Sequence, residues 1–309
     1  MLNRRVLLGA FAAGLALAAP AQAEDWKAKY PELTFGIIPL ENGGDTLTRW
    51  NDFAAYLSKE IGTKVTVRVA QDYAAVIEGQ RAGNIHIGYY GAASFARARL
   101  TGVNIEAFAT DLNKDGSKGY YSVMYVLAKS PYQKIEDLKG KNLGLVDPNS
   151  TSGNNIPRFE LNKMEIKPEE FFAKVVYTGS HENAVLALAQ GTVDVAANQW
   201  TNDSDSTLQQ MLTKGILKHD DGTVFKKDEF RIIHTSQAIL NGPYAVLADL
   251  PADLKTAIAK AFAEAPAKDK AAYDKLFDGQ KIGFTPMVTK DYDPTVDLIK
   301  FVDALRKKG

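Results

Sequence analysis

The sequence contains no cysteine among its 309 residues, which excludes disulfide bonds. It also lacks an excess of either charge, because 37 lysines and arginines balance 37 aspartates and glutamates. A protein that binds nucleic-acid phosphates is expected to carry a basic surface, and this balance gives no indication of one. The length and the 45% content of hydrophobic residues suffice for two lobes with separate cores.

Long apolar runs are also scarce, and the one that stands out lies at the beginning. Residues 1–23 place Arg4 and Arg5 before an apolar stretch and end on Ala21-Gln22-Ala23, a small-x-small cleavage pattern. The segment predicts a secretory signal peptide, exported by the Sec or the Tat route, and hence a periplasmic protein. A membrane anchor is the alternative, which the short run rich in alanine and glycine disfavours. We expect no lipid anchor, since no cysteine follows, and no later membrane span.

The rest of the chain alternates β-rich runs with helical patterns, which is typical of α/β architecture. Residues 46–62, for example, repeat apolar side chains at helical spacing on one face. From Pro251 onward the pattern is largely helical. Strands are expected at 33–40, 64–70, 85–90, 105–110, 120–130, 142–146, 174–179 and 192–198, with two more between 230 and 248.

Two β-α-β blocks, at about 33–110 and 140–200, predict two lobes with a cleft between them, faced by the loops that follow the strands. The expected division is a signal peptide at 1–23, the first part of lobe 1 at 24–122, lobe 2 at 123–237, and a return to lobe 1 with C-terminal helices at 238–309. Such a division requires two segments that cross between the lobes.

The sequence "DPNSTSG" lies between the end of a predicted strand and the start of a predicted helix. A helix begins with unpartnered N–H groups and the positive end of its dipole, and Ser150, Thr151 and Ser152 add hydroxyl donors there. Gly153 is expected to let a ligand approach the backbone, so the segment predicts an anion cradle that needs no lysine. The alternative is a simple N-cap. Pro157, which has no N–H, leaves the start of the helix uncertain by about two residues.

A second strand-to-helix connection of the same kind strengthens the prediction of anion binding. In "GSHENAVLALAQG", Ser180 and His181 follow a predicted strand and precede a predicted helix, so His181 is a candidate donor to an oxyanion. We interpret the other three histidines as structural. No histidine or carboxylate spacing resembles a metal site, and no nucleophile motif appears. The sequence therefore predicts a binding protein without cofactor or metal, not an enzyme.

Five segments, in this order and spacing, resemble the phosphonate-binding periplasmic proteins of ABC importers: "LTFGIIP", "DYAAVIEGQRAGNIHIGYYG", "GYYSVMYVLAK", "DPNSTSG" and "GSHENAVLALAQGTVDVAAN". The resemblance implies the type II periplasmic binding protein fold, with two mixed sheets flanked by helices and a hinge of two crossover segments. It also implies that the phosphonate group binds in the interlobe cleft. The candidate ligand-binding residues are Ser150, Thr151, Ser152, His181, Tyr73, Tyr120, Tyr90, Trp200 and Thr201.

The sequence departs from this pattern where members that bind 2-aminoethylphosphonate carry two carboxylates for the ammonium. An ungapped reading places Thr201 and Gly242 there, and neither can pair with an ammonium. Asp203 or Asp205 could replace the missing carboxylates if the loop is shifted. Trp200 could cover the ligand's substituent. These departures disfavour 2-aminoethylphosphonate and make methylphosphonate or phosphite at least as plausible a ligand.

The resulting hypothesis is a monomeric periplasmic receptor that delivers a phosphonate to the membrane permease of an ABC importer, with no nucleic-acid partner. A receptor for phosphite or hypophosphite is the alternative. A periplasmic enzyme acting on a phosphorylated metabolite is a remote one, since it would need a base or metal near the cradle. A sensor domain that reports ligand occupancy to a membrane partner is a third hypothesis from another class.

Overall fold

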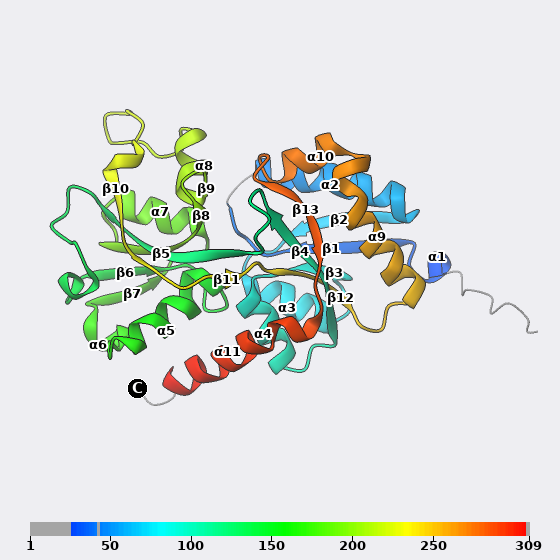
Figure 1. Cartoon of the computed structure of the whole chain (residues 1–309), viewed down its shortest axis with the longest axis horizontal. Helices are drawn as coiled ribbons and strands as arrows, with labels where there is room; N and C mark the ends of the chain where they lie inside the picture. The colour runs from blue at the N-terminus through cyan, green and yellow to red at the C-terminus, as the bar shows by residue number, and fades with distance from the viewer. Residues whose placement is uncertain (1–25, 42–43, 307–309) are drawn as a thin grey trace, which may run out of the picture.

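The computed structural model describes residues 26–41 and 44–306, so the expected signal peptide lies outside the described residues. Figure 1 shows two lobes side by side, each built around one β-sheet. Within the described part of the chain, no helix is both long enough and apolar enough to cross a membrane. The α/β fold with two mixed sheets flanked by helices agrees with the prediction.

The first lobe contains a mixed six-stranded sheet whose outer strands come from both ends of the described chain. Strands β1, β2 and β3 are parallel, whereas β12 runs antiparallel to β3 and β4, and β13 antiparallel to β4. In spatial order the strands are β13 (Lys281–Pro286), β4 (Ile105–Asn113), β12 (Pro243–Leu247), β3 (Ile87–Tyr89), β1 (Glu32–Ile37) and β2 (Lys64–Val69).

The helices of the first lobe are α1 (Trp26–Lys29), α2 (Gly44–Ile61), α3 (Tyr73–Arg81), α4 (Ala92–Leu100), α9 (Ala252–Lys268) and α10 (Lys270–Leu276). Aromatic rings fill the core between this sheet and helices α2 and α9. Phe262 lies at its centre, with ring centroids 5.2 Å from Phe53, 5.1 Å from Tyr244 and 4.9 Å from Phe284. Such edge-on and tilted pairs stabilise a core beyond the burial of their area.

The second lobe has a sheet in the order β10 (Phe230–Thr235), β5 (Gly119–Leu127), β8 (Val195–Asn202), β6 (Asn142–Leu145) and β7 (Lys174–Tyr177). Two short strands, β11 (Ile239–Leu240) and β9 (Asp205–Ser206), pair with β5 and β8. The helices of this lobe are the π-helix η2 (Thr151–Asn155), α5 (Ile156–Lys163), α6 (Pro168–Phe171), α7 (His181–Ala189) and α8 (Thr207–Thr213), with the 3₁₀-helices η1 (Ile135–Leu138) and η3 (Lys227–Glu229).

Two crossover segments connect the lobes and lie side by side. One joins β4 to β5 and the other joins β10 to β12; Ile239 pairs with Tyr120, and the amide of Asn241 donates to the carbonyl of Lys118 at 2.8 Å. The boundary predicted between residues 122 and 123 falls inside β5. How the chain divides into folding units stays a prediction.

The C-terminal part of the chain differs from the helical expectation by one strand, β13. It pairs with β4 and is followed by the 3₁₀-helix η4 (Thr289–Tyr292) and by α11 (Asp293–Arg306). Helix α11 lies along α4 and extends beneath the second lobe (Figure 1), where Phe301 contacts Phe159 of α5 with ring centroids 5.7 Å apart. The last helix therefore contacts both lobes.

Candidate functional site

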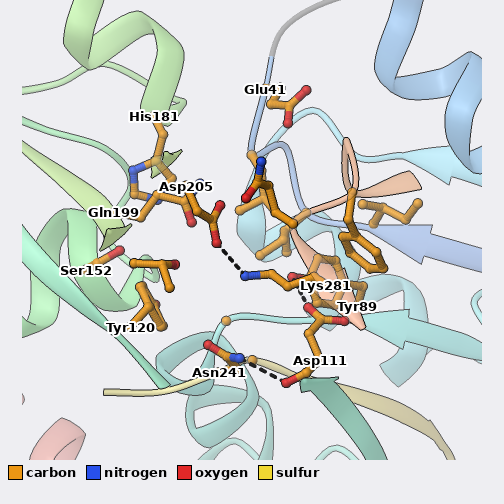
Figure 2. A pocket seen from close by; sticks show the side chains of 18 of the residues that line it. Glu41, Tyr89, Asp111, Tyr120, Ser152, His181, Gln199, Asp205, Asn241 and Lys281 are labelled. Carbon is orange, nitrogen blue, oxygen red and sulfur yellow. Dashed lines mark hydrogen bonds and ion pairs between the residues drawn. The ribbon is translucent and has the colours of Figure 1, made fainter. Parts of the chain in front are cut away.

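The two lobes enclose a pocket lined by residues of both sheets and their following loops (Figure 2). The lining combines the hydroxyl corner of the second lobe with aromatic side chains of the first, such as Trp50 and Tyr89. Of the residues predicted from the sequence to bind ligand, those that line the pocket are Tyr73, Tyr90, Tyr120, Ser150, Thr151, Ser152, His181 and Thr201.

The "DPNSTSG" corner forms a π-helix, in which each amide bonds to the carbonyl five residues earlier. The amide of Asn155 donates to the Ser150 carbonyl at 3.1 Å, and the amide of Ile156 bonds to the Thr151 carbonyl. Pro157 has no N–H for the next carbonyl, that of Ser152, which instead accepts from the Ser122 hydroxyl at 2.6 Å. Pro157 thus ends the π-turn, and α5 continues from it.

The structure offers a packing explanation for Gly153. A Cβ atom at Gly153 would lie 2.3 Å from Val146 Cγ2 and 2.8 Å from Ser150 Oγ. The glycine therefore lets the π-turn pack on the end of β6, where the Val146 amide donates to the Gly153 carbonyl at 2.9 Å. A side chain here would disturb this packing, and Gly153 is not among the residues that line the pocket.

The hydroxyls of Ser150 and Thr151 each accept a hydrogen bond from a backbone amide. Ser150 Oγ caps the turn by accepting from the Gly153 amide at 3.1 Å, and Thr151 Oγ1 accepts from the Ala93 amide at 2.9 Å. A hydroxyl has one proton to donate, and an acceptor lone pair that an amide already uses leaves that proton for another partner. Both side chains are buried at the pocket wall. Each hydroxyl therefore still has its proton to donate, to a ligand or to a neighbouring tyrosine.

Two buried tyrosines extend this set of donors. The Tyr120 hydroxyl interacts with the side chains of Ser152 and Thr151, and the Tyr73 hydroxyl lies by the Ser150 side chain. Burial raises the pKa of both phenols, so both keep their protons. Tyr73 Oη makes no hydrogen bond of ordinary geometry with the described residues although it is shielded from solvent. Because Tyr73 also lines the pocket, its hydroxyl can donate to an acceptor atom of a ligand there.

His181 supplies a further buried position at the first residue of α7. Ser180 caps this helix by accepting from the Asn183 amide at 3.1 Å, and Asn198 Nδ2 donates to the His181 carbonyl at 2.8 Å. Burial lowers the pKa of His181 to about 4, so the imidazole is neutral near pH 7. Its Nδ1 atom is buried and has no hydrogen-bond partner in the described part of the chain. In one tautomer this nitrogen donates without bringing a charge.

The corner as a whole can hold an anion with several acceptor oxygens, because its donors are neutral, buried and aimed into one pocket. In the described ranges no group of three histidine, aspartate or glutamate side chains is placed to hold a metal ion. Residues 35–292 match the family model described as "ABC transporter, phosphonate, periplasmic substrate-binding protein". The chain belongs to this family.

Curated relatives of this phosphonate-binding family carry several ligand names. The chain is 36% identical over 191 residues to the phosphonates-binding periplasmic protein of Escherichia coli, a match covering 60% of this chain and 55% of that protein. It is 32% identical over 211 residues to the phosphate-import protein PhnD of Mycolicibacterium smegmatis, covering 64% of each. A probable phosphite binding protein, PhnD1 of Prochlorococcus marinus, is 29% identical, covering 55% of this chain and 60% of that protein. The matches span under two thirds of these relatives' lengths.

Solved structures share the fold over most of the chain. A binding protein component of an ABC phosphonate transporter from Pseudomonas aeruginosa superposes with a TM-score of 0.76 at 25% identity, covering 88% of this chain and 87% of that one. PhnD1 of Prochlorococcus marinus, solved with methylphosphonate, gives a TM-score of 0.74 at 20% identity, covering 88% and 98%. The type II periplasmic binding protein fold predicted from the sequence is confirmed.

Two of the candidate ligand-binding residues, Trp200 and Tyr90, do not present a free polar group to the pocket. Trp200 does not line the pocket and packs on Tyr121, with ring centroids 5.7 Å apart. Successive side chains of a strand point to opposite faces, so Gln199 and Thr201 of β8 reach the pocket and Trp200 does not. Tyr90 lines the pocket, but its hydroxyl is already bonded to Gln80 Oε1 at 2.7 Å.

Charged residues that the sequence analysis missed also reach the pocket. Lys281 and Asp111 of the first lobe line the pocket. Asp205 lines it too, and the sequence had offered Asp205 as a possible replacement for the missing carboxylates. No local motif marks Lys281, because its strand pairs with β4 far earlier in the chain. Gly242 lines the pocket as well, and a Cβ there would lie 1.8 Å from the Tyr90 carbonyl oxygen. A carboxylate at that position would not fit this backbone.

Proposed function

We propose that this protein is the periplasmic receptor of an ABC importer and binds the phosphonate group of its ligand at the hydroxyl corner. The observation that carries the proposal is the pair of buried hydroxyls, on Ser150 and Thr151, each of which accepts one backbone amide, at 3.1 and 2.9 Å, and keeps its own proton to donate. With the hydroxyl of Tyr73 and, in one tautomer, Nδ1–H of His181, they are the donors that we assign to the ligand. Each hydrogen bond to a charged group contributes ~1.5–3 kcal/mol, so a few suffice for tight binding.

The proposal is a receptor that performs no chemistry. Membership of a substrate-binding family supports this, as does a set of neutral donors that hold an oxyanion without activating a nucleophile. Release to a membrane permease would follow opening of the lobes about the two crossover segments. Export from a signal peptide at residues 1–23, the monomeric state and the lack of a lipid anchor belong to the proposal.

A receptor for phosphite or hypophosphite is the second candidate. It is favoured by the relative named for phosphite, and the same corner would bind the shared phosphorus oxygens. Phosphite differs from a phosphonate only in carrying hydrogen at the fourth position on phosphorus, whereas hypophosphite carries two hydrogens and two oxygens. Phosphate carries a fourth oxygen at this position, and the calorimetric series below measures whether the site accepts it.

Isothermal titration calorimetry of the purified protein tests the proposal. The ligands are methylphosphonate, ethylphosphonate, 2-aminoethylphosphonate, phosphite, hypophosphite and phosphate, with sulfate as a control for any tetrahedral anion. We expect a phosphonate to bind most tightly, and the double variant Ser150→Ala/Thr151→Ala to bind it at least about tenfold more weakly.

A matched control for that variant is Ser206→Ala. Ser206 caps α8 by accepting from the Gln209 amide at 3.1 Å, as Ser150 caps its turn, but it does not line the pocket. Both variants lose a cap of about 1 kcal/mol in stability. Only the first should lose affinity. Binding of none of the phosphorus ligands, or equal losses in both variants, would contradict the proposed function.

A further inference from the structure

The ammonium group of Lys281 lies inside the pocket and pairs with a carboxylate of the opposite lobe. Lys281, at the start of β13 in the first lobe, donates to Asp205 Oδ2 at 2.8 Å and to Asn113 Oδ1 at 2.7 Å. The two charged side chains are only 13% and 12% exposed. Figure 2 shows Lys281 reaching across the pocket to Asp205, with Ser152 and Tyr120 on the far side. The pair is shielded and bridges the lobes.

A second carboxylate, Asp111, faces the same ammonium from the first lobe. It is 3% exposed and accepts hydrogen bonds from the hydroxyls of Tyr244 at 2.9 Å and Tyr89 at 3.2 Å. Burial raises the pKa of Asp111 to about 6, and the charge of Lys281 opposes that rise. Among the described residues, Lys281 is ion-paired with Asp205 and acts on Asp111 through its charge.

The remaining charges at the pocket are paired with one another. Arg49 bonds to both Glu41 and Asp278, the latter at 3.2 Å, so its guanidinium is engaged. Glu41 also faces Lys214 of the second lobe at 3.7 Å. Glu41, Arg49 and Asp278 belong to the first lobe, as Trp50 does, whereas the hydroxyl corner belongs to the second lobe. A ligand held at that corner by its oxygens would direct its fourth substituent toward Lys281 and Asp205.

An ammonium on that substituent would need Asp205, the carboxylate that Lys281 already holds. Displacing Lys281 would break a shielded ion pair, and leaving it in place would bring two cations together with little water between them. An uncharged substituent meets neither cost. We propose that Lys281 is a specificity-determining residue that takes the place of a ligand ammonium, so that the site accepts phosphonates with uncharged substituents and disfavours aminoalkylphosphonates. This inference rests on the proposed function.

The structural reason differs from the sequence argument against 2-aminoethylphosphonate. That argument relied on the lack of carboxylates at positions 201 and 242, whereas the structure supplies Asp205 and Asp111 at the pocket. If missing carboxylates caused the preference, removing Lys281 would bring no gain for a cationic ligand. If Lys281 causes it, removal frees Asp205 and the cationic ligand gains.

Two isosteric ligand pairs separate charge from size: propylphosphonate with 2-aminoethylphosphonate, and ethylphosphonate with aminomethylphosphonate. Calorimetry should show the wild type binding the uncharged member of a pair at least about tenfold more tightly. In Lys281→Met the affinity ratio should fall at least about tenfold, through tighter binding of the amine. Lys281→Gln serves if the methionine variant does not fold.

Lys214→Met is the matched control, because Lys214 also faces a carboxylate of the other lobe but does not line the pocket. It should keep the wild-type ratio. Equal binding of both members by the wild type, or an unchanged ratio in the Lys281 variants, would overturn the inference while leaving the proposed function intact. Failure of every phosphonate to bind the wild type would instead refute the proposed function.

Discussion

The backbone amide of Ala93 donates a hydrogen bond to the hydroxyl of Thr151 at 2.9 Å. Ala93 lies in the first turn of α4 in the first lobe, and Thr151 begins the π-turn of the second lobe. One atom, Thr151 Oγ1, therefore joins the two lobes and still has its own proton to offer to the pocket. Lobe closure and orientation of a ligand donor depend on the same contact.

The substitution Thr151→Val tests this double role, because it removes the hydroxyl and keeps the shape of the side chain. It leaves the Ala93 amide without its partner and removes one donor to the ligand. Methylphosphonate affinity should fall at least about tenfold by calorimetry, and small-angle scattering of the unliganded variant should show a more open molecule. In the control Thr178→Val, the lost hydroxyl bonds within the second lobe, to the Leu145 carbonyl at 3.0 Å. Equal effects in both variants would contradict the assignment.

Tyr73→Phe should separate binding from stability. The hydroxyl of Tyr73 is buried without a hydrogen bond of ordinary geometry, so its removal relieves an unpaired polar group. We expect the free energy of unfolding to stay within about 0.5 kcal/mol of the wild type or to rise, while methylphosphonate affinity falls about fivefold or more.

Tyr273→Phe is the matched control for that change. Tyr273 also has a buried hydroxyl without a partner of ordinary geometry in the described residues, but it lies in the core of the first lobe and does not line the pocket. In chemical denaturation, the free energy of unfolding of both variants should equal or exceed that of the wild type. Calorimetry should distinguish them, and unchanged affinity in Tyr73→Phe would remove this hydroxyl from the site.

His181 should make the protein less stable in mild acid. Burial lowers its pKa from 6.5 to about 4, so between these values the unfolded chain binds more protons than the folded one, and stability falls as the pH falls. Relative to His181→Gln, the wild type should lose about 2 kcal/mol of unfolding free energy between pH 7 and pH 5. Asp111, whose pKa burial raises to about 6, acts in the opposite direction in both proteins and cancels in the comparison. Parallel denaturation profiles would show that His181 is not desolvated.

The two strand-to-helix corners could be predicted because their chemistry is local. Ser150 and Ser180 each cap the helix that follows them, and a cap involves only three or four adjacent residues. Trp200 and Thr201 are neighbours in β8, so their side chains point to opposite faces of the sheet. Both are candidates from the sequence for the same pocket, but only Thr201 lines it, and Trp200 packs on Tyr121.

Lys281 could not be predicted in the same way. Its position follows from the pairing of β13 with β4, where Lys281 stands opposite Asn113, and a register irregularity follows directly after it. The run "KIGFTP" is short and comes after a long helical region, so it gave little strand signal. We propose that the charge of Lys281 sets the ligand preference. A contact between residues far apart in the chain brings that charge to the pocket.

Gly153→Ala distinguishes the two explanations for the glycine of "DPNSTSG". The added Cβ would lie 2.3 Å from Val146 Cγ2 and 2.8 Å from Ser150 Oγ, so the π-turn would have to move off β6 and take Ser150 with it. We expect a loss of about 1–3 kcal/mol in unfolding free energy together with a loss of methylphosphonate affinity. Gly83→Ala is the control, since it strains a backbone with φ of +73° but meets no atom within 4 Å and lies away from the pocket. It should cost stability and leave affinity unchanged. If Gly153→Ala were as stable as the wild type and only weakened binding, the glycine would serve ligand approach after all, as the sequence alone suggested.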